Sequence, residues 1–164
     1  MTGLCELELN TSNDHLLVSQ LLLLLQRHCA GLESLIVLWE SRITPLQLYE
    51  LVRVCCKLRS LYVNKCACIS DAVLVELTRN CPHLQKFAVY NNNEVTEQSV
   101  LALAVHCRQL REMCIHKTTL TEDTVRQLAQ HSRHLTMLVH TNEHNGNTSI
   151  WSVRGIRGLR QLSR

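Results

Sequence analysis

The chain has 164 residues, enough for one domain with a sizeable core, and 46% of them are hydrophobic. Only 4% are aromatic, so we expect an aliphatic core, and five glycines with two prolines argue against disorder and against a turn-dense all-β fold. The net charge of +3 is too small to indicate a nucleic-acid partner by itself, and we expect none.

The first residues predict a strand and not a targeting signal. Leu4, Leu7 and Leu9 supply the apolar positions of a short strand. No basic segment precedes an apolar stretch there, so a signal peptide is not expected. A helical segment follows at residues 17–25, with two extra residues before it, and its apolar run at 21–25 is far shorter than the roughly 20 residues that span a bilayer. We therefore expect no membrane association.

Four cysteines then recur at a fixed interval. Cys29, Cys55, Cys81 and Cys107 are evenly spaced along the chain, and a fifth copy of the pattern has Ser132 in place of cysteine. Their interval of about 26 residues lies in the range that indicates stacked repeats. We call the segment that each of these five residues opens a unit. The last full unit is one residue short, in the turn before its helix.

Each unit predicts one strand and one helix. Apolar residues stand six and eight positions after the cysteine, so they share one face of a strand. These pairs are Leu35 and Val37, Leu61 and Val63, Phe87 and Val89, and Met113 and Ile115. The next segment has apolar residues at helical spacing, such as Leu48, Leu51 and Cys55. Candidate N-caps precede the helices: Thr44, Ser70, Thr96 and Thr121.

One strand and one helix cannot bury their own apolar faces, but a stack of units can. We therefore expect an α/β solenoid over residues 1–142, with parallel inner strands, outer helices and about five to six repeats of ~26 residues. Residues 143–164 are expected to form a loop and a basic C-terminal tail, with an incomplete last repeat as the alternative.

Two further elements are expected in the tail. Ile150, Val153 and Ile156 are spaced for a short helix, and Leu159 and Leu162 for the start of another strand. Three arginines of the tail are candidate contacts with an acidic partner surface: Arg154, Arg157 and Arg160. The alternative is that these arginines belong to a solvated tail.

The recurring cysteines suit a small, buried, apolar position at the turn from helix to strand. Metal binding or redox chemistry is the alternative. The regular spacing argues against the disulfide framework of a secreted protein, although nine cysteines are present. A ladder of buried thiols fits a reducing compartment, so we expect the cytoplasm or the nucleus.

No catalytic set is found in the sequence. It has neither the G-x-x-x-x-G-K-[ST] nor the G-x-G-x-x-G motif. Cys66 and Cys68, with the cysteines at 55–56, lack the paired C-x-x-C spacing typical of zinc sites. Cys114 and His116 alternate on a predicted strand, but neither an orienting third group nor an oxyanion site is identified for them. We expect no enzyme activity, cofactor, metal or small-molecule substrate.

Residues 55–71, "CCKLRSLYVNKCACISD", resemble the cysteine-containing subtype of leucine-rich repeat, whose phrase is C-x-x-L-x-x-L-x-L-x-x-C-x-x-I-[ST]-D. The other units depart at the second cysteine, where Glu40, Asn92 and Thr118 stand. The subtype is best known from F-box proteins, the substrate receptors of cullin–RING ubiquitin ligases. The resemblance implies a ribonuclease-inhibitor-like horseshoe arc that holds a protein partner. The L-P-x-E-type start of an F-box is not found here, so the chain resembles the repeat region of such a receptor.

The strand residues between the buried ones are expected to line a concave surface. Aromatic residues on an open surface are typical interface anchors. The residues that we expect to bind a partner are Leu38, Trp39, Tyr62, Asn64, Tyr90, His116 and Lys117. The alternative is structural, with Trp39 folded under the N-terminal loop and the two tyrosines covering their neighbours.

Two functions are compatible with these expectations. The first is a non-catalytic protein-interaction module that holds a partner, such as a ubiquitin-ligase substrate, on the concave face. The second is a structural scaffold subunit of a large ciliary, cytoskeletal or ribonucleoprotein assembly, whose ends and arginine-rich tail contact neighbouring subunits.

Overall fold

The computed structural model describes residues 4–9, 27–38, 43–116, 120–141, 148–152 and 160–163. It is an α/β structure in which one mixed sheet alternates along the chain with helices. The strands are β1 (Glu6–Leu9), β2 (Ser34–Val37), β3 (Ser60–Asn64), β4 (Lys86–Tyr90), β5 (Glu112–His116), β6 (Met137–Thr141), β7 (Thr148–Ser152) and β8 (Arg160–Ser163). The helices are η1 (Cys29–Gly31), α2 (Pro45–Val54), α3 (Asp71–Asn80), α4 (Glu97–His106) and α5 (Glu122–His131).

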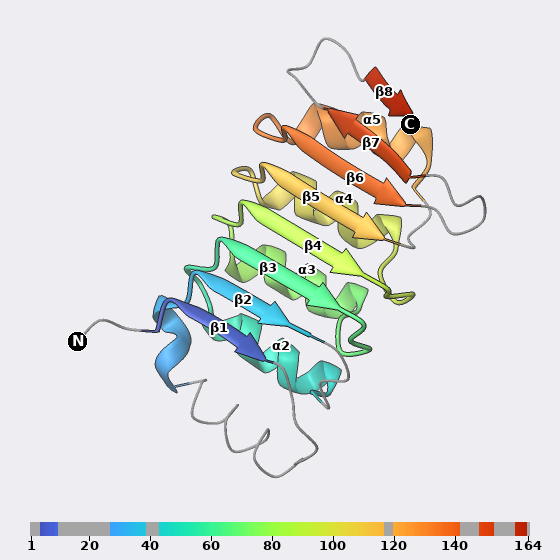
Figure 1. Ribbon diagram of the computed structural model, residues 1–164. Helices are drawn as coiled ribbons and strands as arrows, with labels where there is room; N and C mark the ends of the chain where they lie inside the picture. The colour runs from blue at the N-terminus through green and yellow to red at the C-terminus, as the bar shows by residue number, and fades with distance from the viewer. Residues whose placement is uncertain are drawn as a thin grey trace.

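The strands lie side by side in chain order, from β1 to β8. Strands β1 to β6 run parallel, and the four α-helices lie together on one face of the sheet (Figure 1). The expected parallel strands and alternating helices are therefore confirmed. No helix in the described ranges is both long and apolar enough to cross a membrane.

The register of the sheet reproduces the period of the sequence. Ser34 pairs with Ser60, which pairs with Lys86, which pairs with Glu112, so each partner lies one full unit further along the chain. The β1–β2 pairing, from Glu6 to Ser34, is longer than one unit because two extra residues precede the first helical segment. The β5–β6 pairing is shorter than one unit because the last unit is one residue short.

The core lies between the sheet and its helices. The strand residues that alternate towards the helices are fully buried, as expected: Leu35, Val37, Leu61, Val63, Phe87, Val89, Met113 and Ile115. They form one cluster with buried leucines and valines of the helices, such as Leu48, Leu51, Leu74 and Leu103. Strands β2 to β5 thus each have one face in the core and one face turned away from the helices.

The recurring cysteines are buried, as expected, and 0% of each is exposed: Cys29, Cys55, Cys81 and Cys107. The last three end helices α2, α3 and α4 as C-caps. Two of the thiols reach the unit before them, since Cys81 Sγ lies 3.0 Å from the carbonyl oxygen of Cys55 and Cys107 Sγ lies 3.6 Å from that of Cys81. Burial raises the pKa of the Cys81 and Cys107 thiols to about 12, so both stay protonated.

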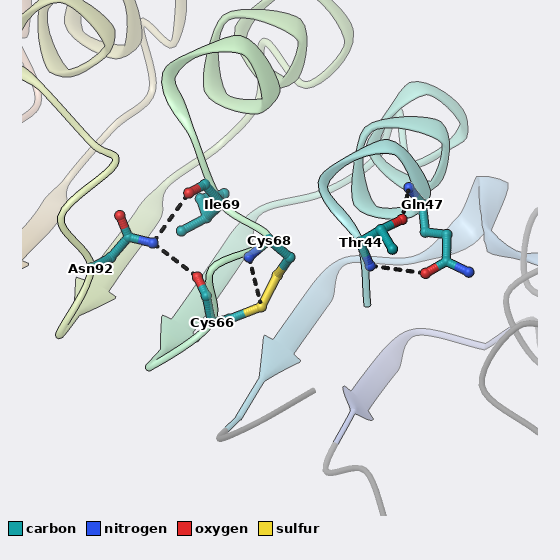
Figure 2. The surroundings of a disulfide bond; sticks show 6 residues. All are labelled: Thr44, Gln47, Cys66, Cys68, Ile69 and Asn92. Carbon is teal, nitrogen blue, oxygen red and sulfur yellow. Dashed lines mark hydrogen bonds between the residues drawn. A yellow bond between two sulfur atoms is a disulfide. The ribbon is translucent and has the colours of Figure 1, made fainter. Parts of the chain in front are cut away.

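Each α-helix begins after its expected N-cap residue, though the caps differ. Thr44 forms a complete capping box with Gln47, in which each side chain accepts from the other residue's backbone N–H (Figure 2). Thr96 and Thr121 also accept backbone N–H groups of their own helices. Ser70 makes no such side-chain bond, so its helix begins without this contact.

The first acidic residue of one helix holds the N-cap of the next. Asp71 accepts from Thr96 through both the backbone N–H, at 2.9 Å, and the hydroxyl, at 2.6 Å. Glu97 in the same way accepts the backbone N–H of Thr121. Burial opposes ionisation of Asp71, but hydrogen bonds from Ser99 and Thr96 outweigh it and lower the pKa of this carboxyl below its ordinary value of 3.8.

The structure departs from expectation at Cys66, which matches the second cysteine of the repeat phrase. Cys66 and Cys68 form a disulfide bond (Figure 2), although the sequence did not favour disulfides. The other seven cysteines form none. Asn92 stands at the equivalent position of the next unit, and its amide donates to the carbonyl oxygens of Cys66 at 2.8 Å and Ile69 at 3.1 Å. A buried asparagine therefore ties these turns together where cysteine is absent.

The helix expected over Ile150, Val153 and Ile156 is wrong at its start, because residues 148–152 form β7. This strand pairs antiparallel with β6, with Val139 opposite Ile150. An N-G pair between two strands is a strong reversal signal, and it favours a hairpin here over a new helix. The strand expected near Leu162 exists as β8, but it runs antiparallel to β7 and does not continue the parallel series.

Candidate protein-binding face

The sheet has a second face, turned away from the described helices (Figure 1). On strands β2 to β5, and at Leu38 just after β2, this open face includes half-buried side chains: Ile36, Leu38, Tyr62, Asn64, Ala88, Tyr90, Cys114 and His116. They lie between the buried core residues because side chains alternate along a strand. The register brings Tyr62 beside Ala88, and Ala88 beside Cys114.

Three rings form a row across strands β3, β4 and β5. The ring centroids of Tyr62 and Tyr90 are 5.4 Å apart, and those of Tyr90 and His116 are 6.0 Å apart, with tilted planes in both pairs. These spacings lie within the range for favourable aromatic pairs. The three rings therefore present a continuous, pre-ordered surface of mixed apolar and polar character.

The central tyrosine is held by the neighbouring strand. Cys114 Sγ and Tyr90 Oη share a hydrogen bond, at 2.9 Å. This bond, together with burial and the nearby Cys114 and Tyr62, raises the pKa of the Tyr90 phenol, so that it stays neutral. Burial also raises the pKa of Cys114, which disfavours the thiolate that a cysteine nucleophile needs.

His116 ends the row with an unsatisfied group. Its Nδ1 atom is buried and has no hydrogen-bond partner among the residues that the structure describes. A buried polar atom without a partner costs free energy, and such atoms are uncommon in folded proteins. The imidazole therefore has an unused hydrogen-bonding position at the carboxyl end of β5.

The backbone turns sharply where β3 and β4 end. Lys65 and Asn91 both have positive φ angles, of 51° and 53°, in the left-handed region. The turn places the Asn91 amide 3.2 Å from Asn64 Oδ1, and the backbone N–H of Lys65 donates to the carbonyl oxygen of Tyr90 at 3.0 Å. Polar amides thus border the ring row at the carboxyl ends of the strands.

Charged pairs border the same surface at the opposite ends of the strands. Lys86 and Glu112 are 3.1 Å apart on adjacent strands, and Arg59 and Glu33 are 3.3 Å apart just before theirs. All four side chains are well exposed, so each pair contributes little to stability. An apolar centre with a polar rim is the usual anatomy of a protein interface.

The structure brings five of the expected binding residues together: Leu38, Tyr62, Asn64, Tyr90 and His116. Trp39 and Lys117 lie outside the described residues, as do Arg154 and Arg157 of the tail. Arg160 begins β8, but its side chain is outside the described part.

Sequence reasoning missed the contact between Cys114 and the Tyr90 hydroxyl. Alternation had placed both residues on one face, but only the register shows that a thiol in one unit reaches a phenol in the unit before it. Within the described ranges, no three His, Cys, Asp or Glu side chains are grouped so that they could hold a metal ion.

A scan against protein-family models finds no family that matches the chain, and a search of curated proteins finds no relative. Neither comparison therefore bears on its function.

Proposed function

We propose that the chain is a cysteine-containing leucine-rich-repeat solenoid, with the arc of ribonuclease-inhibitor-like proteins, and that it is a non-catalytic protein-interaction module. Three observations support this architecture: the register of one unit per strand in the parallel sheet, the position of helices α2 to α5 on the same face, and the buried thiols at the helix ends. Each unit buries the flank of its neighbour and leaves one strand face to form a continuous binding surface.

The observation that carries the function is the ring row on the open face. Tyr62, Tyr90 and His116 are ordered before any partner arrives, because they contact one another and Cys114 holds the central ring. A pre-ordered surface loses little side-chain entropy on binding, and aromatic residues are frequent anchors of protein interfaces. The partner is a protein segment that lies across strands β3 to β5.

The resemblance to F-box receptors extends the proposal to the partner's fate. In that family the repeats hold the substrate of a cullin–RING ubiquitin ligase, so we assign this chain the role of substrate recognition. The four buried thiols of the ladder fit an intracellular, reducing compartment, whereas the Cys66–Cys68 disulfide does not contribute to this argument.

The test is to replace the rings and measure partner recovery. The tagged chain, the Tyr62→Ala/Tyr90→Ala variant and a matched Tyr49→Ala control are purified from cells, and bound proteins are quantified by mass spectrometry. Tyr49 lies on helix α2, against Arg53, so its loss removes an aromatic ring from the helical side. All three proteins should keep their circular dichroism spectrum and still unfold in one cooperative transition, although each loses packing contacts of its rings.

We expect the double variant to bind a stoichiometric partner at least about 30-fold more weakly, which corresponds to about 2 kcal/mol of binding free energy. The control should bind this partner as the unmodified chain does. Recovery of the ubiquitin-ligase adaptor with that partner would support the role in substrate recognition. Equal recovery by the double variant and the unmodified chain would show that the open face does not bind it.

A further inference from the structure

A cleft of ≈ 460 Å³ lies at the C-terminal ends of helices α4 and α5. The lining residues come from these helix ends and the turns after them: Val105, Arg108, Gln130, His131, Arg133 and His134. The two turns lead into the starts of β5 and β6, whereas Tyr90 and His116 of the ring row lie where their strands end. The cleft is therefore separate from the open face.

The lining is basic. It includes two arginines and two histidines, and none of the described residues that line it is acidic. Five other basic side chains form ion pairs with carboxylates: Arg53, Arg59, Arg79, Lys86 and Arg126. Arg108 and Arg133 are in none of the ion pairs of the described residues, so no carboxylate of that part neutralises their charges.

The two arginines occupy the same position of consecutive units. Arg108 follows Cys107, and Arg133 follows Ser132, which stands where the recurring cysteine is expected. The residues at this position in the earlier units are Ala30, Cys56 and Pro82. The fold therefore does not require arginine there, and consecutive units bring both arginines to the lining of one cleft. Two neighbouring cations without a carboxylate suit an anion that contacts both.

We propose that this cleft binds a phosphate monoester group. A guanidinium presents a planar fork of N–H donors that matches phosphate oxygens, and a dianion can accept from both arginines at once. The cleft volume falls in the range of small-ligand sites, roughly 300–1,000 Å³. Val105, 42% exposed, offers an apolar wall for the body of the ester, and Gln130 adds a neutral hydrogen-bonding group.

The phosphate can be part of a small molecule or of a phosphorylated side chain on a partner. Isothermal titration calorimetry on the whole chain separates these sources with three probes: phenyl phosphate, a phosphoserine peptide and benzoate. We expect phenyl phosphate to bind one-to-one and at least about tenfold more tightly than the singly charged benzoate, because hydrogen bonds to a dianion are stronger. Tighter binding of the peptide than of phenyl phosphate would identify a partner's side chain as the source. Tighter binding of phenyl phosphate than of the peptide would identify a small ester.

Replacement of the arginines tests the site directly. Arg108→Gln and Arg133→Gln should each weaken phenyl phosphate binding about tenfold, since each loses a charge-assisted hydrogen bond. Arg79→Gln is the matched control, because it removes an exposed arginine from the last turn of α3, outside the cleft, and should change the affinity less than about twofold. All are surface changes, so unchanged melting temperatures are expected.

Three results would overturn the proposal. The first is the absence of phenyl phosphate and phosphoserine peptide binding at millimolar concentration. The second is equal weakening by Arg79→Gln and by the cleft variants. The third is far tighter binding of a single-stranded uridine oligonucleotide than of either phosphate probe, with an affinity that all three variants weaken equally. This would indicate a diffuse polyanion surface. None of these results affects the ring row, which shares no residue with the cleft.

Discussion

The fifth unit allows a sharp test of the cysteine ladder, because it carries Ser132 where the earlier units carry cysteine. Ser132 is only 1% exposed, and its hydroxyl has no hydrogen-bond partner in the described part of the chain. A buried hydroxyl without a partner costs about 1–3 kcal/mol, whereas a thiol is a weaker donor that behaves as a small apolar group. We therefore expect Ser132→Cys to raise the free energy of unfolding by about 1 kcal/mol. The full penalty is not recovered, because the larger sulfur atom fits less well.

The mirror substitution is Cys107→Ser in the preceding unit. Cys107 Sγ lies 3.6 Å from the carbonyl oxygen of Cys81, a distance that suits sulfur but is too long for a serine hydroxyl on its shorter bond. This variant should lose about 1–2 kcal/mol, for the reason that Ser132→Cys gains it. The two changes exchange the same atoms in opposite directions at equivalent positions.

Chemical and thermal unfolding, followed by circular dichroism under reducing conditions, measures both effects. A change of 1 kcal/mol shifts the melting temperature of a domain of this size by about 2–4 °C. If Ser132→Cys lowered the melting temperature while Cys107→Ser left it unchanged, the thiol position would not favour sulfur, and the stated reason for the ladder would be wrong.

Three more predictions concern single side chains. Asn92→Ala should destabilise the protein by about 2–4 kcal/mol in urea unfolding, because it leaves buried backbone groups unpaired, while the exposed Asn93→Ala changes stability by less than about 0.5 kcal/mol. Asp71→Ala should lower stability by about 1 kcal/mol at neutral pH. Because the folded pKa of this carboxyl is below 3.8, its contribution to stability is present above that pH and is lost as the pH falls through the folded value. The unfolding free energies of the two proteins should therefore converge at low pH. A difference that stays constant with pH would contradict this. In iodoacetamide labelling of the native chain, the exposed Cys56 should react while Cys81, buried and with a raised pKa, should not; rapid labelling of both would contradict the burial of the ladder.

Much of the fold results from one local rule repeated along the chain. The spacing of Cys55, Cys81 and Cys107 fixed the register in advance, because every unit must present the same apolar flank to the next. Strand alternation likewise placed Tyr62 and Tyr90 on the face away from the helices.

The exceptions lie where the repetition breaks. Residues 148–152 were expected to start a helix, and a short apolar run outside the period cannot distinguish helix from strand by itself. Cys68 has no counterpart in the repeated pattern, so its bond to Cys66 could not be read from the period. The pairing of Arg108 with Arg133 in one cleft depends on how two units stack, although their equivalent positions in sequence were a usable signal.

The bonds from Asp71 to Thr96 and from Glu97 to Thr121 make the stack directional. Helices α4 and α5 each begin on a group supplied by the helix before them, and among the described residues no equivalent bond runs back to the earlier helix. An isolated copy of either segment would therefore begin with its threonine N–H facing solvent, and ordering would spread most readily from the amino-terminal neighbour towards the carboxyl-terminal one. Damage at Asp71 should therefore loosen the start of α4, whereas α2 keeps its own capping box with Gln47.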